Sequence, residues 1–154
     1  MTHVTKDLLA LSYGMDVESI AVLVGWWRRG IRLHWIGYAE ASNRWPDTYV
    51  YRPIIDEWLA TVGFPTITDV RTLASIDAAC ADYFAAHIKA GGKVQRTIGY
   101  DPDPLGLRRS GETEGPWSWI YPLREWGWNR DRCLLEMAKV GLAVPRALEH
   151  GKAA

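Results

Sequence analysis

The chain of 154 residues has the size of a single domain, and 48% of its residues are hydrophobic and 23% are charged. This composition excludes a disordered or fibrous chain and predicts one soluble globular domain spanning residues 1–154. The 18 basic and 18 acidic residues cancel, which argues against a strong nonspecific field for nucleic acid or an anionic membrane. The longest apolar stretch, Ile20 to Trp27, is too short to span a bilayer, so we expect a cytoplasmic protein with no membrane partner.

Strand and helix signals alternate from the start of the chain. Residues 7–12 (DLLALS) form a short apolar run that stops at Tyr13-Gly14, which predicts a buried strand opening into a turn. Residues 17–29 are apolar on nearly every side and end at Gly30, which predicts a deeply packed helix. Residues 31–37 (IRLHWIG) alternate and predict a second strand, so that a β-turn-α-β unit closes.

The alternation continues through the second half of the chain. Pro46 at a first helical position predicts a helix that ends near Gly63. The later predicted elements are a strand at 66–70, an alanine-rich helix at 75–90, a strand at 94–100 and a helix at about 130–140 capped by Asn129. Residues 101–116 collect Pro, Gly and charge and are expected to form a loop, and 146–154 a frayed tail.

This order of elements predicts an α/β fold, a Rossmann-like doubly wound parallel sheet with helices on both faces. In such sheets ligands bind outside the carboxyl ends of the strands, where the strand order reverses. The turn after the first strand, Ser12 to Ser19 (SYGMDVES), is therefore the place to look for a ligand. Its backbone N–H groups and the positive end of the following helix favour an anion, for which phosphate is the natural candidate.

The Ser12 to Ser19 turn is neither a Walker loop nor a GxGxxG fingerprint. It resembles the PP-loop of ATP pyrophosphatases and phosphoadenosine-phosphosulfate-reductase-like proteins, in the variant Ser-Tyr-Gly-x-Gly-x-Asp-Ser found in phage and bacterial relatives. Ser12, Tyr13, Gly14 and Ser19 match that pattern. Asp16 replaces a glycine and Glu18 replaces the usual aspartate, and a carboxylate at Asp16 would repel a polyphosphate unless Mg²⁺ lay between them.

Two further segments carry the same resemblance. Residues 40–49 (EASNRWPDTY) are similar to the family's acidic and Trp/His-Pro-Glu/Asp-Thr step before the second helix. Residues 121–133 (YPLREWGWNRDRC), continued by 141–145, are similar to its C-terminal signature. The Cys-Ser-x-Lys-x-Lys step of many relatives is reduced here to Cys80 and Lys89, and the reductase segment Glu-Cys-Gly-Leu-His is absent. The resemblance therefore does not imply reduction to sulfite.

The resemblance implies an adenine nucleotide alpha hydrolase-like domain that binds ATP or a related adenine nucleotide with Mg²⁺. The activity it implies is cleavage between the α- and β-phosphates or adenylyl transfer. Ser12, Gly14 and Ser19 would hold phosphate, Glu18 would reach Mg²⁺ or the loop backbone, and Asp47 and Thr48 would border the ligand. The full set of nucleotide-site residues is Ser12, Tyr13, Gly14, Met15, Asp16, Glu18, Ser19, Asp47 and Thr48. The residues give no catalytic group and no acceptor substrate.

Two alternatives remain open for the function. Asp16 and the shortened middle of the chain fit a catalytically silent relative that keeps the fold as a binding or regulatory module. The tryptophan-rich segment from Trp117 to Trp128, with Arg124, Arg130 and Arg132 beside it, fits contacts with single-stranded nucleic acid or an adenine ring. Core packing of these tryptophans is the plainer interpretation, and we assign Trp126 and Trp128 to packing under the last helix.

The remaining titratable residues predict no metal site. Cys80 and Cys133 lack CxxC spacing and are expected to be free, packed thiols. His34 and His87 have no spaced partner and are expected to be ordinary structural residues. The acidic residues of the predicted loop are expected to form a solvated surface rather than a Mg²⁺ site; they are Asp101, Asp103, Glu112 and Glu114.

Overall fold

A computed structural model describes residues 7–39, 46–98 and 112–142 of the chain. The strands are β1 (Leu8–Tyr13), β2 (Trp35–Ala39), β3 (Ile67–Val70), β4 (Val94–Ile98), β5 (Glu112–Glu114) and β6 (Trp117–Ile120). The helices are α1 (Val17–Arg28), α2 (Pro46–Val62), α3 (Leu73–Tyr83), α4 (Ala85–Lys89), α5 (Pro122–Trp126) and α6 (Arg130–Lys139).

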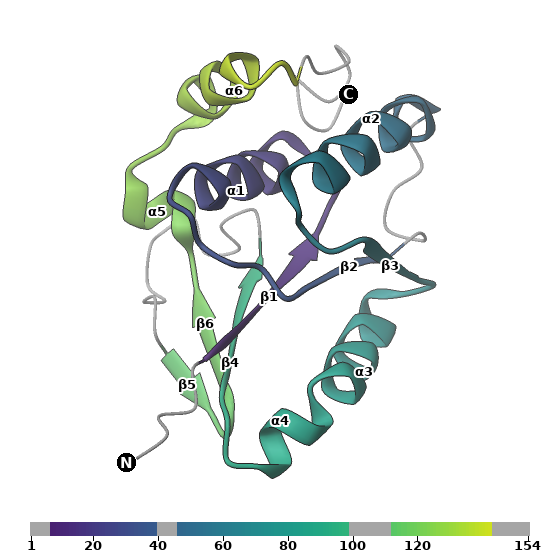
Figure 1. Cartoon of the computed structure of the whole chain (residues 1–154), viewed down its shortest axis with the longest axis vertical. Helices are drawn as coiled ribbons and strands as arrows, with labels where there is room; N and C mark the ends of the chain where they lie inside the picture. The colour runs from purple at the N-terminus through teal and green to yellow at the C-terminus, as the bar shows by residue number, and fades with distance from the viewer. Residues whose placement is uncertain (1–6, 40–45, 99–111, 143–154) are drawn as a thin grey trace.

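The strands form one six-stranded sheet in the order β3-β2-β1-β4-β6-β5. All neighbouring pairs are parallel except β5 and β6, which are antiparallel. Helices α1, α2 and α6 cover one face of the sheet and α3 and α4 the other (Figure 1). The predicted α/β architecture, mostly parallel and Rossmann-like with helices on both faces, is therefore confirmed at this level.

The direction of the chain reverses beside the first strand. From β1 the chain moves outward through α1, β2 and α2 to β3, and it then returns across the other face so that β4 pairs with β1 on its free side. The carboxyl ends of β1 and β4 thus meet at the point where the strand order reverses, which is where ligands bind in sheets of this kind.

Two cores lie on the two faces of the sheet, and β1 contributes to both by alternation. Leu9, Leu11 and Tyr13 belong to the larger core under α1, α2 and α6, and Ala10 belongs to the smaller one under α3. Helix α1 is buried from Val17 to Trp26 except at Glu18. The deep packing predicted for this helix is confirmed.

The second strand lies further along the chain than predicted. We expected residues 31–37, whereas β2 runs from Trp35 to Ala39. Gly30 has a φ of 67° and the N–H of Ile31 donates to the carbonyl of Trp26, so the residues after the helix form its C-terminal cap. The N–H of His34 then donates to the carbonyl of Leu9, and β2 begins at the next residue.

The predicted helix at 75–90 is two helices. Thr72 caps α3, because its Oγ1 accepts the N–H of Ser75 at 3.2 Å, so the first helix begins before the predicted residue 75. The break lies at Phe84, which is 1% exposed and has φ −96° and ψ 8°. Its buried ring packs in the smaller core, so the side chain of an aromatic residue, not a glycine or proline, marks the point where one helix ends and the next begins.

The predicted loop at 101–116 contains the short strand β5, which forms a hairpin with β6 through Gly115. Residues 99–111 and the tail 143–154 lie outside the described residues. Helix α5 was not predicted; Pro122 begins it and Gly127, with a φ of 67°, ends it. The cap of α6 is confirmed, because Asn129 Oδ1 accepts the N–H of Arg132 at 2.8 Å.

The side chains expected to be structural are so in the described ranges. Cys80 and Cys133 are free and buried, and burial raises the pKa of Cys80 to about 11 and that of Cys133 to about 12. His34 Nδ1 accepts the N–H of Leu9 at 3.0 Å, and His87 Nε2 lies 2.9 Å from the carbonyl of Lys93.

Among residues 7–39, 46–98 and 112–142, none of the helices has the length and apolar character that a membrane span requires.

Candidate functional site

The candidate site is the turn between β1 and α1, at the carboxyl edge of the sheet. Ser12 lies opposite Ile98 in the register of β1 and β4, so this turn begins at the point where the strand order reverses. Three residues, Gly14 to Asp16, join the strand to the helix. The sequence motif therefore lies where a Rossmann-like sheet binds its ligands.

A left-handed residue shapes the turn. Met15 has a φ of 56°, the positive value that residues other than glycine adopt uncommonly. Its side chain is 1% exposed, and the hydroxyl of Tyr13 donates to its sulfur at 3.0 Å. The buried thioether and the tyrosine together hold a backbone conformation that brings Gly14 close to the first turn of α1.

Two N–H groups, one in the turn and one in the first turn of α1, donate to side chains of the same segment. The N–H of Gly14 donates to Ser19 Oγ at 3.0 Å, and Ser19 is completely buried. The N–H of Ser19 donates to Asp16 Oδ1 at 2.8 Å. Asp16 thus caps the helix with a carboxylate, which takes a position at the helix N-terminus that a bound anion would favour.

The second carboxylate oxygen of Asp16 lies against Gly14. A β-carbon placed on Gly14 would be 2.9 Å from Asp16 Oδ2 and 3.5 Å from Ser19 Oγ. A side chain at this position would therefore require the Asp16 carboxylate to shift. The glycine of the motif makes room for the protein's own carboxylate.

The candidate metal ligand Glu18 is paired with a distant arginine. Glu18 Oε1 lies 2.7 Å from Arg130 Nη1, and the two side chains are 28% and 33% exposed. This ion pair connects the first turn of α1 to the first residue of α6. It also brings together two of the three segments on which the family resemblance rests, residues 12–19 and 121–133.

The other predicted site residues are only partly brought together. Alternation along β1 directs Ser12 to the face of Ala10, under α3, whereas Ser19 lies on the opposite face, in α1. The two residues therefore approach the turn from opposite faces of the sheet, and their joint contact with phosphate stays a prediction. Asp47 and Thr48 lie in the first turn of α2, and their side chains lie outside the described part of the structure.

Buried tyrosines lie beneath the turn, and sequence reasoning missed them. Tyr13 and Tyr38 lie opposite each other on β1 and β2, with ring centroids 6.1 Å apart. Burial, with a contribution from Tyr51, raises the pKa of Tyr13 well above its usual value, and burial raises the pKa of Tyr51 to about 12. The hydroxyls of Tyr51 and Thr97 are buried and have no partner among the described residues. The sequence feature that could have indicated this cluster is the position of Tyr13 and Tyr38 near the ends of β1 and β2 and of Tyr51 in the first half of α2.

The tryptophan-rich segment is packed, as its plainer interpretation predicts. A β-carbon on Gly25 of α1 would lie 2.1 Å from the Trp126 ring, so this glycine lets the indole reach the helix backbone. The guanidinium of Arg29 lies 3.9 Å above the centroid of Trp126 and 5.5 Å from that of Trp128. Both tryptophans contact the larger core. Their packing is confirmed, but Trp126 lies against α1 rather than under the last helix, and Trp128 lies near Arg132 of α6.

The other two tryptophans of the segment are also covered by a cation. The guanidinium of Arg96 lies 5.5 Å from the ring of Trp117 and 4.7 Å from that of Trp119, and it pairs with Asp77 at 2.7 Å. These rings lie under α3 and not at the carboxyl edge near Ser19. The structure therefore separates the Trp117 and Trp119 pair from the candidate nucleotide site.

No group of three or more metal-binding side chains occurs within residues 7–39, 46–98 and 112–142. Asp101 and Asp103 lie outside these ranges, as does the side chain of Glu112, and Glu114 is exposed in β5.

Comparison of the sequence with models of known protein families and with curated proteins finds no match. The chemistry of the site must therefore be argued from its own residues.

Proposed function

We propose that this protein binds ATP or a related adenine nucleotide at the β1–α1 turn, with the phosphates toward the start of α1. The observation that carries the proposal is the coincidence of three features: the reversal of strand order beside β1, the tight Gly14–Asp16 turn, and an anion already seated on the N–H of Ser19. That anion is the carboxylate of Asp16. Its position at the positive end of the helix supports the proposal that negative charge is favoured there.

Asp16 decides how a nucleotide would bind. A phosphate close to Asp16 must displace the carboxylate from Ser19 or share a cation with it, because two anions a few ångströms apart repel strongly near a protein surface. Asp16 and Glu18 supply carboxylate oxygens of the type that Mg²⁺ accepts. The proposal therefore includes Mg²⁺-dependent binding, with Glu18 exchanging part of its contact to Arg130.

The family resemblance extends the proposal to adenylyl transfer or cleavage between the α- and β-phosphates. In such chemistry a protein acts mainly by positioning and by stabilising charge. Arg130 is the cation that lies next to the turn, through Glu18. Release of pyrophosphate from ATP is the readout of this extended proposal.

The second candidate is a silent relative that keeps the fold as a scaffold. Its support is specific: Asp16 occupies the N–H of Ser19, Ser19 Oγ occupies the N–H of Gly14, and Glu18 is neutralised by Arg130. In this alternative the turn has replaced its ligand with its own side chains.

Isothermal titration with ATP, with and without Mg²⁺, separates the candidates. The protein variants are the wild type, Asp16→Asn and Asp16→Gly. Asn keeps an oxygen to cap the helix and removes the charge, whereas Gly frees the N–H of Ser19. Binding by the wild type only with Mg²⁺, and by Asp16→Asn also without it, supports nucleotide binding. Binding by Asp16→Gly alone supports the silent scaffold, and no binding by any variant rejects the nucleotide proposal.

A further inference from the structure

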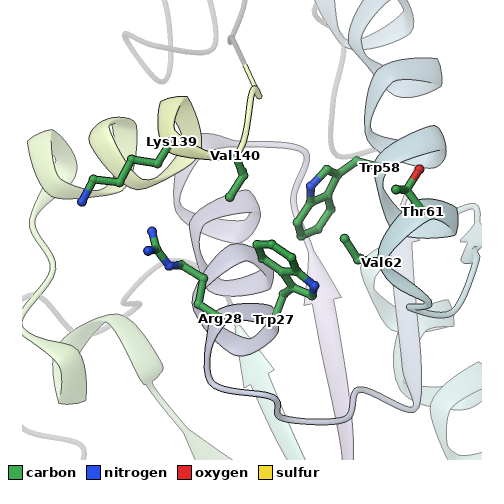
Figure 2. Close-up of a pocket in the computed structure, with 7 residues that line it drawn as sticks. All are labelled: Trp27, Arg28, Trp58, Thr61, Val62, Lys139 and Val140. Atoms are coloured by element: carbon green, nitrogen blue, oxygen red, sulfur yellow. The ribbon is translucent and has the colours of Figure 1, made fainter.

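A groove lies at the other end of helix α1, away from the β1–α1 turn. It is an open depression of about 680 Å³ between the C-terminal ends of α1, α2 and α6. Its lining residues are Trp27, Arg28, Trp58, Thr61, Val62, Lys139 and Val140 (Figure 2). We call it the α1–α2–α6 groove.

One side of the groove is aromatic and accessible. Trp27 is 41% exposed, and its ring packs edge-to-face on that of Trp58 with centroids 6.0 Å apart. Phe64 packs edge-to-face on Trp58, with ring centroids 6.2 Å apart. Ile54, one helical turn before Trp58, is 44% exposed. An exposed indole beside a fixed one gives an apolar surface into which a large side chain can pack.

The other side of the groove is cationic. In Figure 2, Arg28 and Lys139 lie together on the side away from Trp58 and Val62. Their side chains are 43% and 47% exposed, although both contact the buried carboxylate of Glu136, at 2.6 and 3.1 Å. Among the described lining residues two are positively charged and none is negatively charged.

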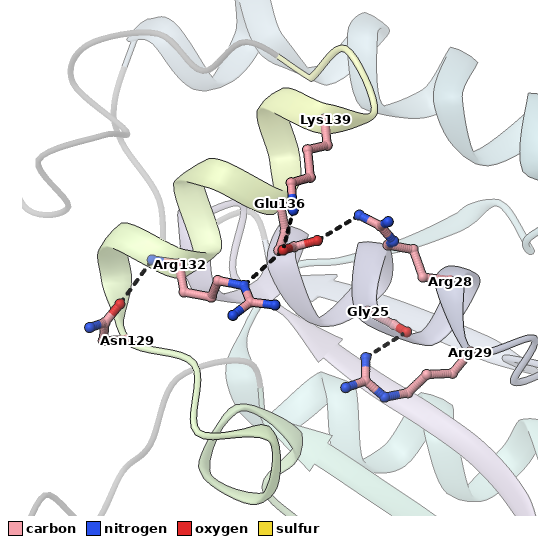
Figure 3. A network of polar contacts seen from close by, with 7 residues as sticks. All are labelled: Gly25, Arg28, Arg29, Asn129, Arg132, Glu136 and Lys139. Carbon is pink, nitrogen blue, oxygen red and sulfur yellow. Dashed lines mark hydrogen bonds and ion pairs between the residues drawn. The ribbon is translucent and has the colours of Figure 1, made fainter.

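The carboxylate of Glu136 does not neutralise this side. Glu136 also pairs with Arg132 at 2.7 Å, so three cations share one acidic side chain (Figure 3). Burial by itself would raise the pKa of Glu136, but the hydrogen bonds from Arg132 and Lys139 outweigh this effect and lower it, so Glu136 stays ionised. The cluster retains two positive charges, and its carboxylate is only 3% exposed while its cations face solvent.

We propose that the α1–α2–α6 groove binds an acidic peptide segment of a partner protein, with a large apolar anchor residue against Trp27 and Trp58 and acidic side chains on Arg28 and Lys139. The excess positive charge selects the acidic residues, and its separation from the indoles fixes their place next to the anchor. This inference does not depend on nucleotide binding, because its residues lie at the opposite end of α1.

The same cations are less suited to single-stranded nucleic acid. Base stacking needs free ring faces along a positively charged track. The neighbouring indoles Trp126 and Trp128 are instead covered by the guanidinium groups of Arg29 and Arg132, with Arg29 3.9 Å from the Trp126 centroid. These two indoles therefore do not continue the aromatic surface of the groove as free stacking faces.

The test is a selection of random dodecapeptides displayed on phage, with the intact protein immobilised. Individual peptides from the bound phage are then measured by fluorescence anisotropy. We expect the retained peptides to pair acidic residues with a neighbouring Trp, Phe or Leu. Their affinity should fall at least about tenfold for Lys139→Glu and for Trp27→Ala. Lys89→Glu on α4, across the sheet, is the matched control and should leave affinity unchanged.

A charge exchange makes the test specific. Changing one acidic residue of a selected peptide to Lys should restore part of its affinity for the Lys139→Glu protein. Circular dichroism melting confirms that each variant is folded. Retained peptides without acidic residues, or peptides that bind Lys139→Glu as tightly as the wild type, would overturn the proposal. Groove-dependent binding of the oligonucleotide (dT)12, or a dimer in sedimentation that Trp27→Ala dissociates, would replace the peptide with nucleic acid or a second copy of the chain.

Discussion

The two ends of helix α1 differ in how their polar and charged groups are paired. At the N-terminal end two N–H groups are paired within the turn, because Asp16 accepts from Ser19 and Ser19 accepts from Gly14. At the C-terminal end three cations share the single carboxylate of Glu136 and remain accessible. A motif that matches a ligand-binding pattern can thus be paired with its own side chains, whereas a helix end without a motif can present unbalanced charge.

The largest effect is expected at the C-terminal half of α1, where Trp126 contacts Gly25. Gly25→Ala places a β-carbon 2.1 Å from the indole, so the ring and α5 must move. Overpacking of this kind costs about 2 kcal/mol of the free energy of unfolding, measurable by urea denaturation. With Trp126→Leu in the same chain, Gly25→Ala should cost much less, whereas additive effects of the two changes would contradict the contact.

Glu136→Gln tests the cluster at the same end. Removal of the shared carboxylate leaves Arg28, Arg132 and Lys139 without their acidic partner, but these cations are about half exposed and can be hydrated. We expect a loss of about 1–2 kcal/mol, less than for a fully buried ion pair. High salt should reduce the difference between the variant and the wild type. A stability equal to that of the wild type would show that the cluster contributes nothing to folding.

The cap at the N-terminal end is tested by two substitutions of Asp16. Asp16→Ala removes the acceptor of the Ser19 N–H and should cost about 1 kcal/mol, whereas Asp16→Asn keeps an acceptor oxygen and should cost a few tenths at most. Thermal melting and urea denaturation measure both. If the two variants were equally unstable, the charge of Asp16 rather than its hydrogen bond would stabilise the turn.

The smallest effect is a pH dependence at the start of β1. His34 Nδ1 accepts the N–H of Leu9, and burial, with the charges of Arg32 and His87, lowers the pKa of His34 below 6.5. The unfolded chain therefore binds more protons than the folded one below about pH 6.5, so stability falls as pH decreases through that value. His34→Asn retains an acceptor and should flatten this dependence in urea denaturation between neutral and mildly acidic pH. An unchanged slope would assign it to other groups.

Local signals explain how much of the fold could be predicted. The buried runs of β1 and α1, the proline before α2 and the Asn129 cap depend on neighbours in sequence, and all four are observed. Two boundaries were wrong: the C-terminal cap of α1 extends to Ile31 and moved the start of β2, and a break at Phe84, whose ring is buried in the smaller core, divides the third predicted helix. The strands of the β5–β6 hairpin have only three and four residues, which is too short for a clear alternating pattern.

The position of the motif in the fold was predicted from the sequence, but the contacts of its side chains were not. The motif at Ser12 to Ser19 lies at the reversal of strand order, as expected. The alternation of β1 was sufficient to place Ser12 on the face opposite Leu11 and Tyr13, but the motif pattern alone does not include this alternation. The pairing of Glu18 with Arg130 joins residues 112 positions apart, and the α1–α2–α6 groove combines three helices. Neither could be read from spacing.

The central claim is that the start of α1 binds an anion and that the Asp16 carboxylate repels this anion unless Mg²⁺ lies between them. Titration of the wild type and Asp16→Asn with ATP tests this claim most directly. The account predicts Mg²⁺-dependent binding to the wild type and binding to Asp16→Asn that is at least about tenfold tighter without Mg²⁺. Equal affinities for the two proteins, or no binding to either while both remain folded, would contradict it.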